Sequence, residues 1–234
     1  MLLRSFFRSP EKLKVYWEQF LVEAMDIGVG SLTIVVLIST FLGAVTTIQT
    51  SFQLTSGLIP KSVIGAIVAN TSLLELAPTI TSLVLAGKVG SSIASHLGTM
   101  RVTEQIDALE VMGINSSAFL IMPKIAASLV TFPLLVTIAA FLQIGGGLLA
   151  GHLTGQVAAA DFIQGAREFF DPFQVTFMMI KAVTFGYIIS SISSYQGYYT
   201  SGGALEVGQS STRSVVYSCI ILLLADYILA QVLL

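Results

Sequence analysis

Three ionisable side chains lie within long apolar stretches of this sequence and are the first candidates for chemistry. Glu75 lies in the motif LLELAP, three positions before Pro78, whereas Lys181 and Asp226 lie in two later apolar stretches. A charge inside a membrane helix is costly and usually faces a protein interior or a water-filled cavity, which indicates a functional site. The sequence therefore predicts a functional role for Glu75, with Lys181 and Asp226 as weaker candidates.

Each of these residues also has a structural alternative. The carboxyl group of Glu75 can be protonated, or it can hydrogen-bond the backbone groups that Pro78 leaves free. Lys181 can pair with Asp226, or it can extend its ammonium group toward the membrane surface. The sequence alone leaves these alternatives open.

A second polar segment, RVTEQIDALEVMG, occupies residues 101–113. It has four charged side chains in thirteen positions, although 10% of the whole chain is charged. In a single helix, Val102, Ile106 and Leu109 would share one side with Gly113, and this glycine would end the helix. Such a helix has too little apolar surface for a domain core, but it suits docking into a groove on another protein. The alternative is a solvated connector.

The motifs of common enzyme classes are missing from the sequence. LAGKVGSS is similar to a phosphate-binding loop, but Ser82 replaces the first glycine and Val89 replaces the Ser or Thr of that loop. No GxSxG or HExxH motif occurs, and the single Cys219 and the distant His96 and His152 do not have the spacing of zinc ligands. We therefore expect no enzymatic activity and no bound cofactor in this chain.

The composition is typical of an integral membrane protein. Hydrophobic residues make up 54% of the 234 residues, and the mean hydropathy is +0.86, more than a soluble domain of this size usually carries. The formal net charge of −2 shows no basic excess that would favour a nucleic-acid partner.

The elements that would position the candidate residues are all helical. An amphipathic helix within residues 1–27, beginning at Ser9 and Pro10, is predicted to lie on the membrane surface, with packing on a partner as the alternative. A short outer helix is expected within residues 154–172, closed by Asp171 and Pro172. Crossing a bilayer takes about 20 apolar residues. Five segments are long enough for this: 30–53, 63–97, 118–153, 173–194 and 214–233.

Two further features concern the shape and packing of these spans. Pro78 and Pro133 are the predicted kink points of the second and third spans. Small residues recur every four positions near the ends of the same two spans, which predicts close helix packing. They are Ala86, Gly90, Ala94 and Gly98 in one row and Gly147, Gly151 and Gly155 in the other.

Basic residues are distributed unequally between the two sides of the membrane. With the N-terminus inside, the outer side holds Lys61 and Arg167. The inner side holds Arg4, Arg8, Lys12, Lys14, Lys88, Arg101, Lys124 and Arg213. Because cytoplasmic loops carry an excess of Lys and Arg, this bias predicts a cytoplasmic N-terminus and a cytoplasmic 98–117 loop. The odd number of spans then leaves the C-terminus outside, which is the periplasm if the membrane is a bacterial inner membrane.

Four motifs carry a resemblance to a known family: LLELAP, the long block GKVGSSIASHLGTMRVTEQIDALEVMGIN, PLL after it, and STRSVV near the C-terminus. Together they are similar to the MlaE-type permease family of lipid ABC transporters, and the similarity covers nearly the whole chain. It implies a single all-α permease domain over residues 1–234 in a bacterial inner membrane. It further implies a homodimer, a dimer of cytoplasmic ATPase subunits that bind ATP and Mg²⁺, and a hexamer of periplasmic MCE-domain proteins.

The resemblance also implies roles for particular residues. A helix between the second and third spans couples the family's permeases to the ATPase; here it matches Arg101, Thr103, Glu104, Gln105, Asp107, Leu109 and Met112. The family's lipid cavity lies between the first, second and fifth spans; here it matches Glu75, Leu74, Thr47, Leu73, Tyr217 and Ile221. Arg213 matches an arginine before the last span. Some members carry an arginine where this chain has Leu74, so a headgroup contact of that arginine does not carry over.

The function that the resemblance implies is ATP-driven movement of phospholipids between the inner and outer membranes, with this chain as the transmembrane subunit. Two alternatives remain open at this point. One is a proton-coupled secondary transporter in which Glu75, Asp226 and Lys181 form a relay. The other is a membrane scaffold that anchors an assembly of MCE proteins.

Overall fold

The apolar stretches of the sequence form long helices in the computed structural model, which describes residues 13–54 and 60–233. No strand occurs within these described ranges. Five helical stretches are long and apolar enough to cross a membrane: Tyr16–Gln53, Ser62–Val102, Ser116–Leu153, Pro172–Tyr198 and Ala204–Leu233. The predicted all-α membrane fold with five spans is confirmed.

The first long helix, α2 (Leu13–Gln53), is longer than one span requires. We expected a surface helix to end at residue 27 and a span to begin at residue 30, but one helix continues through Gly28 and Gly30. Isolated glycines are tolerated within a helix, so the surface segment and the first span form a single element. The expected helix start at Ser9 and Pro10 lies outside the described residues.

The second span consists of five consecutive helical pieces: α3 (Ser62–Thr71), the π-helix η1 (Ser72–Ile80), α4 (Thr81–Leu85), the π-helix η2 (Ala86–Gly90) and α5 (Ser91–Val102). Pro78 lies in η1, and proline cannot donate the backbone hydrogen bond of a regular helix. The π-helical turn of η1 is wider than an α-helical turn. It is the distortion found at the position where we expected a kink. Glu75 lies in the same widened segment, and such segments are frequent at functional sites.

The third span is α7 (Ser116–Leu153), which continues as an uninterrupted helix past Pro133. It is followed by the short helix α8 (Ala159–Glu168), which lies within the range expected for an outer helix.

The fourth and fifth spans begin differently from our expectation. Asp171 accepts a hydrogen bond from the backbone N–H of Phe173, and Pro172 occupies the first turn, so these residues begin α9 (Pro172–Tyr198) and do not close α8. The last helix, α10 (Ala204–Leu233), begins well before residue 214, where we placed the start of the fifth span.

Small residues allow the long helices to approach closely, as their four-residue spacing predicted. A side chain at Gly147 in α7 would collide with the hydroxyl of Thr47 in α2. A Cβ atom at Gly98 in α5 would lie 3.3 Å from the hydroxyl oxygen of Thr200. Gly155 is different, because it has a φ of +68° in open space and follows the end of α7.

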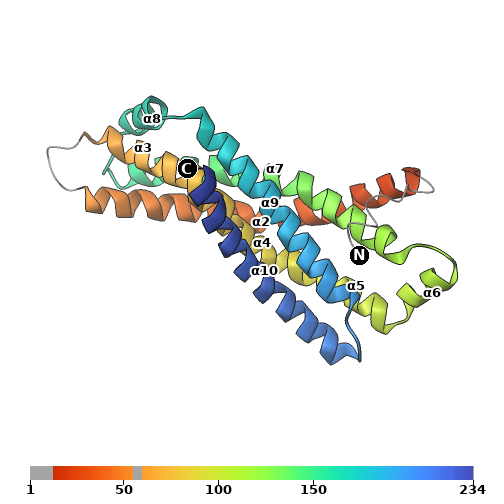
Figure 1. Cartoon of the computed structure of the whole chain (residues 1–234). Coiled ribbons are helices and arrows are strands. Elements are labelled where there is room, and N and C mark those ends of the chain that lie inside the picture. Colours follow the sequence, from red (N-terminus) through yellow and green to blue (C-terminus); the bar gives the residue numbers. More distant parts are fainter. Residues whose placement is uncertain (1–12, 55–59, 234) are drawn as a thin grey trace.

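Helix α9 is the element around which the other spans are arranged, because it packs against α5, α7, α10 and η1. Its fully buried side chains include Lys181, Phe185 and Ile189. Figure 1 shows α8 and the short helix α6 (Gln105–Val111) at opposite ends of the molecule, with the C-terminus toward the α8 end. The polar segment between the second and third spans thus forms one tip of the bundle.

Candidate functional site

Lys181 joins three of the spans through its ammonium group. Its Nζ lies 2.7 Å from Glu75 Oε2 in η1, 2.6 Å from Asp226 Oδ1 in α10, and 3.0 Å from the backbone carbonyl oxygen of Leu74. The Lys181 side chain is fully buried, and its Nζ also lies 4.8 Å from the centre of the Phe177 ring. These contacts replace the water that a buried ammonium group loses. We refer to Glu75, Lys181 and Asp226 as the charge cluster.

The charge cluster resolves one of the alternatives that the sequence left open. Lys181 does not extend to the membrane surface, because it pairs with Asp226 and also with Glu75. The sequence brought Glu75 together with Lys181 only in the relay alternative, since helical periodicity orders residues within one helix but does not say which helices meet. The available signal was the presence of isolated opposite charges in separate apolar segments.

The two carboxylates of the charge cluster differ in accessibility. The Glu75 side chain is 49% exposed, whereas the Asp226 side chain is 13% exposed. When all three groups are ionised, two negative charges face one positive charge. Glu75 is therefore the member that can offer a carboxylate oxygen to a cationic group, or to a proton, that arrives from outside the helix bundle.

Three of the other residues matched to the lipid cavity are accessible. Tyr217 and Ile221 are exposed on α10, and Leu74 is half-buried next to Glu75. These side chains can contribute to a ligand surface.

The remaining two residues matched to the cavity, Thr47 and Leu73, are buried within the chain. The Thr47 hydroxyl donates to the backbone carbonyl oxygen of Gly43 at 3.0 Å and packs against α7. In this structure both side chains face neighbouring helices, so neither is open to a ligand. Their assignment to the cavity rests on the family resemblance, which does not by itself determine which side of a helix a residue occupies.

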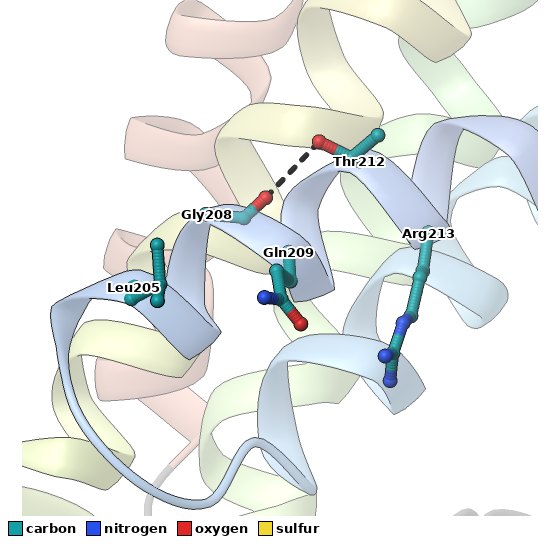
Figure 2. A pocket seen from close by; sticks show the side chains of 5 residues that line it. All are labelled: Leu205, Gly208, Gln209, Thr212 and Arg213. Carbon is teal, nitrogen blue, oxygen red and sulfur yellow. Dashed lines mark hydrogen bonds between the residues drawn. The ribbon is translucent and has the colours of Figure 1, made fainter.

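A hollow of about 460 Å³ lies on one face of α10 (Figure 2). It is lined by Leu205, Gly208, Gln209, Thr212 and Arg213. Arg213, the residue matched to a family arginine, is exposed and extends away from the helix in Figure 2. Because all the lining residues belong to one helix, the hollow is an open depression. Arg213 and Asp226 are about 20 Å apart along α10, so the hollow is separate from the charge cluster.

Residues 101–113 form a turn and a short helix, and not the single helix that we expected. Helix α5 ends at Val102, Glu104 adopts a left-handed backbone with a φ of 60°, and α6 begins at Gln105. An ion pair of 2.7 Å between Arg101 and Asp107 bridges this break.

Two further features of the turn concern its ends. The side-chain amide of Gln105 donates to the Thr103 hydroxyl at 3.0 Å, which holds the start of α6. Gly113 has a φ of 80° and follows the end of α6, as its position in the sequence predicted.

The break changes which apolar side chains of this segment face outward. Ile106 is fully buried and Leu109 is half-buried, so the predicted apolar side faces the protein's own spans. Val111 and Met112 are 89% and 65% exposed, and we refer to these two residues as the apolar tip. Met112 was among the predicted contact residues. Val111 was missed because the helical periodicity had been counted from residue 101 without a break.

A group of three hydrogen-bonding side chains holds the end of α6 against the spans. Glu110 Oε1 accepts hydrogen bonds from the hydroxyls of Ser116 at 2.8 Å and Tyr198 at 3.0 Å, and these two hydroxyl oxygens lie 2.7 Å apart. The hydrogen bonds hold the pKa of Glu110 below its ordinary value. Helices α6, α7 and α9 meet at this point, a contact that no motif in the sequence predicted.

Comparison with known proteins identifies the family of this chain. Residues 20–232 match the family model described as Permease MlaE. The chain belongs to the MlaE permease family. A probable ABC transporter permease protein of Rickettsia bellii is 35% identical to it over 229 residues, which are 98% of this chain and 86% of that relative.

Other relatives of this MlaE permease come from photosynthetic organisms. A probable ABC transporter permease protein of Synechocystis sp. is 32% identical over 205 residues, which are 87% of this chain and 77% of the relative. The chloroplastic protein TRIGALACTOSYLDIACYLGLYCEROL 1 of Arabidopsis thaliana is 36% identical over 220 residues, which are 94% of this chain and 63% of the relative.

As an MlaE permease, the chain is the multi-pass membrane subunit of an ABC transporter. A permease of this class works with an ATPase subunit and so needs a surface on which to receive it. The apolar tip is the candidate for that surface, and the charge cluster is the candidate contact for cargo.

Proposed function

We propose that this MlaE permease moves phospholipids between the inner and outer membranes as the homodimeric membrane subunit of an ABC transporter. Two ATPase subunits bind its cytoplasmic end, and a hexamer of MCE-domain proteins exchanges lipid with its periplasmic end. The observation that carries this proposal is the half-exposed carboxylate of Glu75 among apolar spans. A polar group within an apolar surface offers both kinds of contact that an amphiphilic lipid requires.

The exposed side of the charge cluster suits a lipid headgroup. Glu75 offers a carboxylate oxygen to an ammonium group, and a hydrogen bond between two charged groups is stronger than a neutral one. Tyr217 and Ile221, which are exposed on α10, offer apolar surface to acyl chains. Leu74 carries no charge for a phosphate, so we propose no phosphate contact at that position.

The apolar tip supports the site of the ATPase. A short helix that ends in exposed apolar side chains suits a groove on a partner protein. The hydrogen bonds of Glu110 hold the tip against α7 and α9, so a push on the tip acts on the spans. ATP and Mg²⁺ bind to the ATPase subunit in this proposal, because the phosphate-binding loop pattern fails in this chain.

The orientation follows from the basic residues. Their excess lies in the N-terminal segment and around residues 98–117, which favours the cytoplasm for both. Helix α6 and the C-terminus lie toward opposite ends of the bundle in Figure 1, in agreement with a cytoplasmic tip and a periplasmic C-terminus. The membrane is the inner membrane of a bacterium.

Mass spectrometry of co-purifying lipids tests the cargo site. We expect Glu75→Gln to lower the amount of bound phospholipid, with an affinity loss of about tenfold, because a hydrogen bond to a charged group is lost. Glu168→Gln is the matched control, since Glu168 is an exposed carboxylate at the end of α8. An unchanged phospholipid complement in Glu75→Gln would exclude Glu75 as a cargo contact.

The charge cluster also favours one alternative, a proton-coupled secondary transporter, because its second carboxylate can take up a proton. This alternative predicts that the purified permease alone supports flux of a fluorescent phospholipid down a proton gradient in vesicles. Our proposal predicts no flux until ATPase subunits and ATP are added.

A further inference from the structure

We propose that Tyr198 is a positioning residue that links the apolar tip to helix α9 and, through α9, to the charge cluster. The inference rests on the proposed function, because it assumes that the ATPase acts on the apolar tip. Tyr198 is the last residue of α9, and Lys181 lies on the same uninterrupted helix. Displacement of the tip therefore reaches the lipid site along a single element.

The contacts of Tyr198 join α9 to both sides of the turn. Its hydroxyl donates to Glu110, near the end of α6, at 3.0 Å. Its ring centre lies 6.0 Å from the guanidinium carbon of Arg101, near the end of α5. Arg101 in turn pairs with Asp107 of α6. Movement of α6 relative to the spans must stretch these contacts or carry the end of α9 with it.

Helix α9 is suited to transmit such a movement. Tyr198 and Lys181 are about 25 Å apart along the helix. A Cβ atom at Gly197 would lie 2.6 Å from the carbonyl oxygen of Ala94, so α9 and α5 are in close contact next to Tyr198. Close-packed interiors have low compressibility and transmit strain, so a shift at Tyr198 is passed along the helix.

The far end of this path lies in the charge cluster. Lys181 Nζ contacts Glu75 at 2.7 Å and Asp226 at 2.6 Å, and the two carboxylates belong to different spans. A displacement of about 1 Å would lengthen the hydrogen bond to Glu75 beyond hydrogen-bonding distance and would change the length of the ion pair with Asp226. Movement of α9 therefore changes how tightly Glu75 is held, and with it the availability of this carboxylate to a headgroup.

The test compares lipid transport per ATP hydrolysed in the wild type and in Tyr198→Phe. Both are reconstituted in vesicles with the ATPase and MCE partners, using a fluorescent phosphatidylethanolamine as the probe. The variant keeps the ring and loses the hydroxyl. We expect unchanged ATPase binding and at least about fivefold fewer lipids moved per ATP, the lower end of typical coupling between sites. Tyr195→Phe is the matched control: Tyr195 is 54% exposed on the same helix, and its hydroxyl makes no hydrogen bond within the described structure.

A double-mutant cycle distinguishes the specific link from a general loss of structure. Glu110→Ala should also lower the number of lipids moved per ATP, and the double variant should be no worse than the poorer single variant, because both substitutions remove the hydrogen bond between Tyr198 and Glu110. The inference would be overturned if Tyr198→Phe moved as many lipids per ATP as the wild type, or if the losses of the two single variants added in the double variant. It would also be overturned if ATPase binding and lipid transport fell equally. If the wild-type permease bound no ATPase, the proposed function itself would fail, and the inference with it.

Discussion

Among single residues, Lys181 determines which spans of the molecule are held together at the centre. It is fully buried and contacts two carboxylates from two other spans. The loss of one partner from a buried ion pair is more costly than the net contribution of the pair, because it leaves a charge without compensation. The stability of the charge cluster therefore depends on keeping both its positive and its negative side chains.

Replacement of Lys181 by methionine should lower the free energy of unfolding by about 3–5 kcal/mol, since the poorly accessible Asp226 loses its cationic partner. Denaturant unfolding in detergent micelles measures this effect. Lys61→Met, at an exposed lysine before the second span, should change the free energy of unfolding very little. Equal stability of Lys181→Met and the wild type would contradict the ion pairs described here.

Glu110 gives the tip a defined pH dependence. Hydrogen bonds from Ser116 and Tyr198 hold its folded-state pKa below the ordinary value of 4.5. Its contribution to stability is therefore complete above pH 4.5 and is lost as the pH falls through the lower folded-state pKa. The difference in melting temperature between the wild type and Glu110→Gln should be constant near neutral pH and shrink in acid. A difference that grows on acidification would refute the assignment.

Among the elements, the turn between α5 and α6 determines which side chains a partner can reach. The left-handed backbone at Glu104 separates two helices and leaves Val111 and Met112 exposed, while Ile106 anchors α6 to the spans. A groove on the ATPase would therefore contact the end of α6 and not the side that a continuous helix would have presented.

Val111→Asp should weaken ATPase binding by about tenfold or more, because it places a charge in the centre of an apolar contact. Folding should be unaffected, since Val111 is 89% exposed. Titration of the purified ATPase against the permease in detergent measures the affinity. Phe169→Asp, at an exposed aromatic residue after α8 and so at the other end of the bundle, serves as the control. Wild-type affinity in Val111→Asp would exclude the apolar tip as the contact.

Helix α2 is fixed to α7 by a second ion pair, between the half-buried Glu23 and the buried Lys124. Glu23→Ala should lower the free energy of unfolding by about 3–5 kcal/mol, because Lys124 is left buried without a partner. The double replacement Glu23→Leu with Lys124→Met should recover most of this loss, since it removes both charges. Unfolding in denaturant compares the variants, and a double variant less stable than Glu23→Ala would show that the pair is not the cause.

Hydropathy was sufficient to predict the number of spans, because the thickness of the bilayer fixes the length of a crossing helix. It was poor at predicting where the helices begin and end. Residues 204–213 are too polar to count as a span, yet they belong to α10, since hydropathy reports contact with lipid and not helix formation. Gly28 and Gly30 suggested that the helix is broken at these positions. Helix α2 nevertheless continues through both glycines, and its packing against α7 does not require a break.

The sequence predicted the part of the candidate site that one unusual residue type reveals. Glu75 stands out because a carboxylate is rare in an apolar segment. Its contact with Lys181 depends on how η1 and α9 pack, which one sequence does not reveal. Likewise, the exposure of Val111 depends on the backbone of Glu104, a non-glycine residue for which a left-handed conformation is uncommon.

For the molecule as a whole, the two sites are far apart and share one helix. The apolar tip lies at the α6 end of the bundle (Figure 1), and the charge cluster joins residues of three spans. Helix α9 reaches both, through Tyr198 at the tip and through Lys181 in the cluster. An ATP-driven permease requires such an arrangement, because force is applied at the partner surface while the cargo is held elsewhere.

The central claim is that this permease moves phospholipid only when an ATPase acts on the apolar tip. The direct measurement is transfer of a fluorescent phospholipid in vesicles that contain the permease, the ATPase and the MCE partner, with and without ATP. We predict transfer that requires ATP and is abolished by Met112→Asp, which places a charge in the tip. Transfer that proceeds without ATP, or that persists at the wild-type rate in Met112→Asp, would contradict the account.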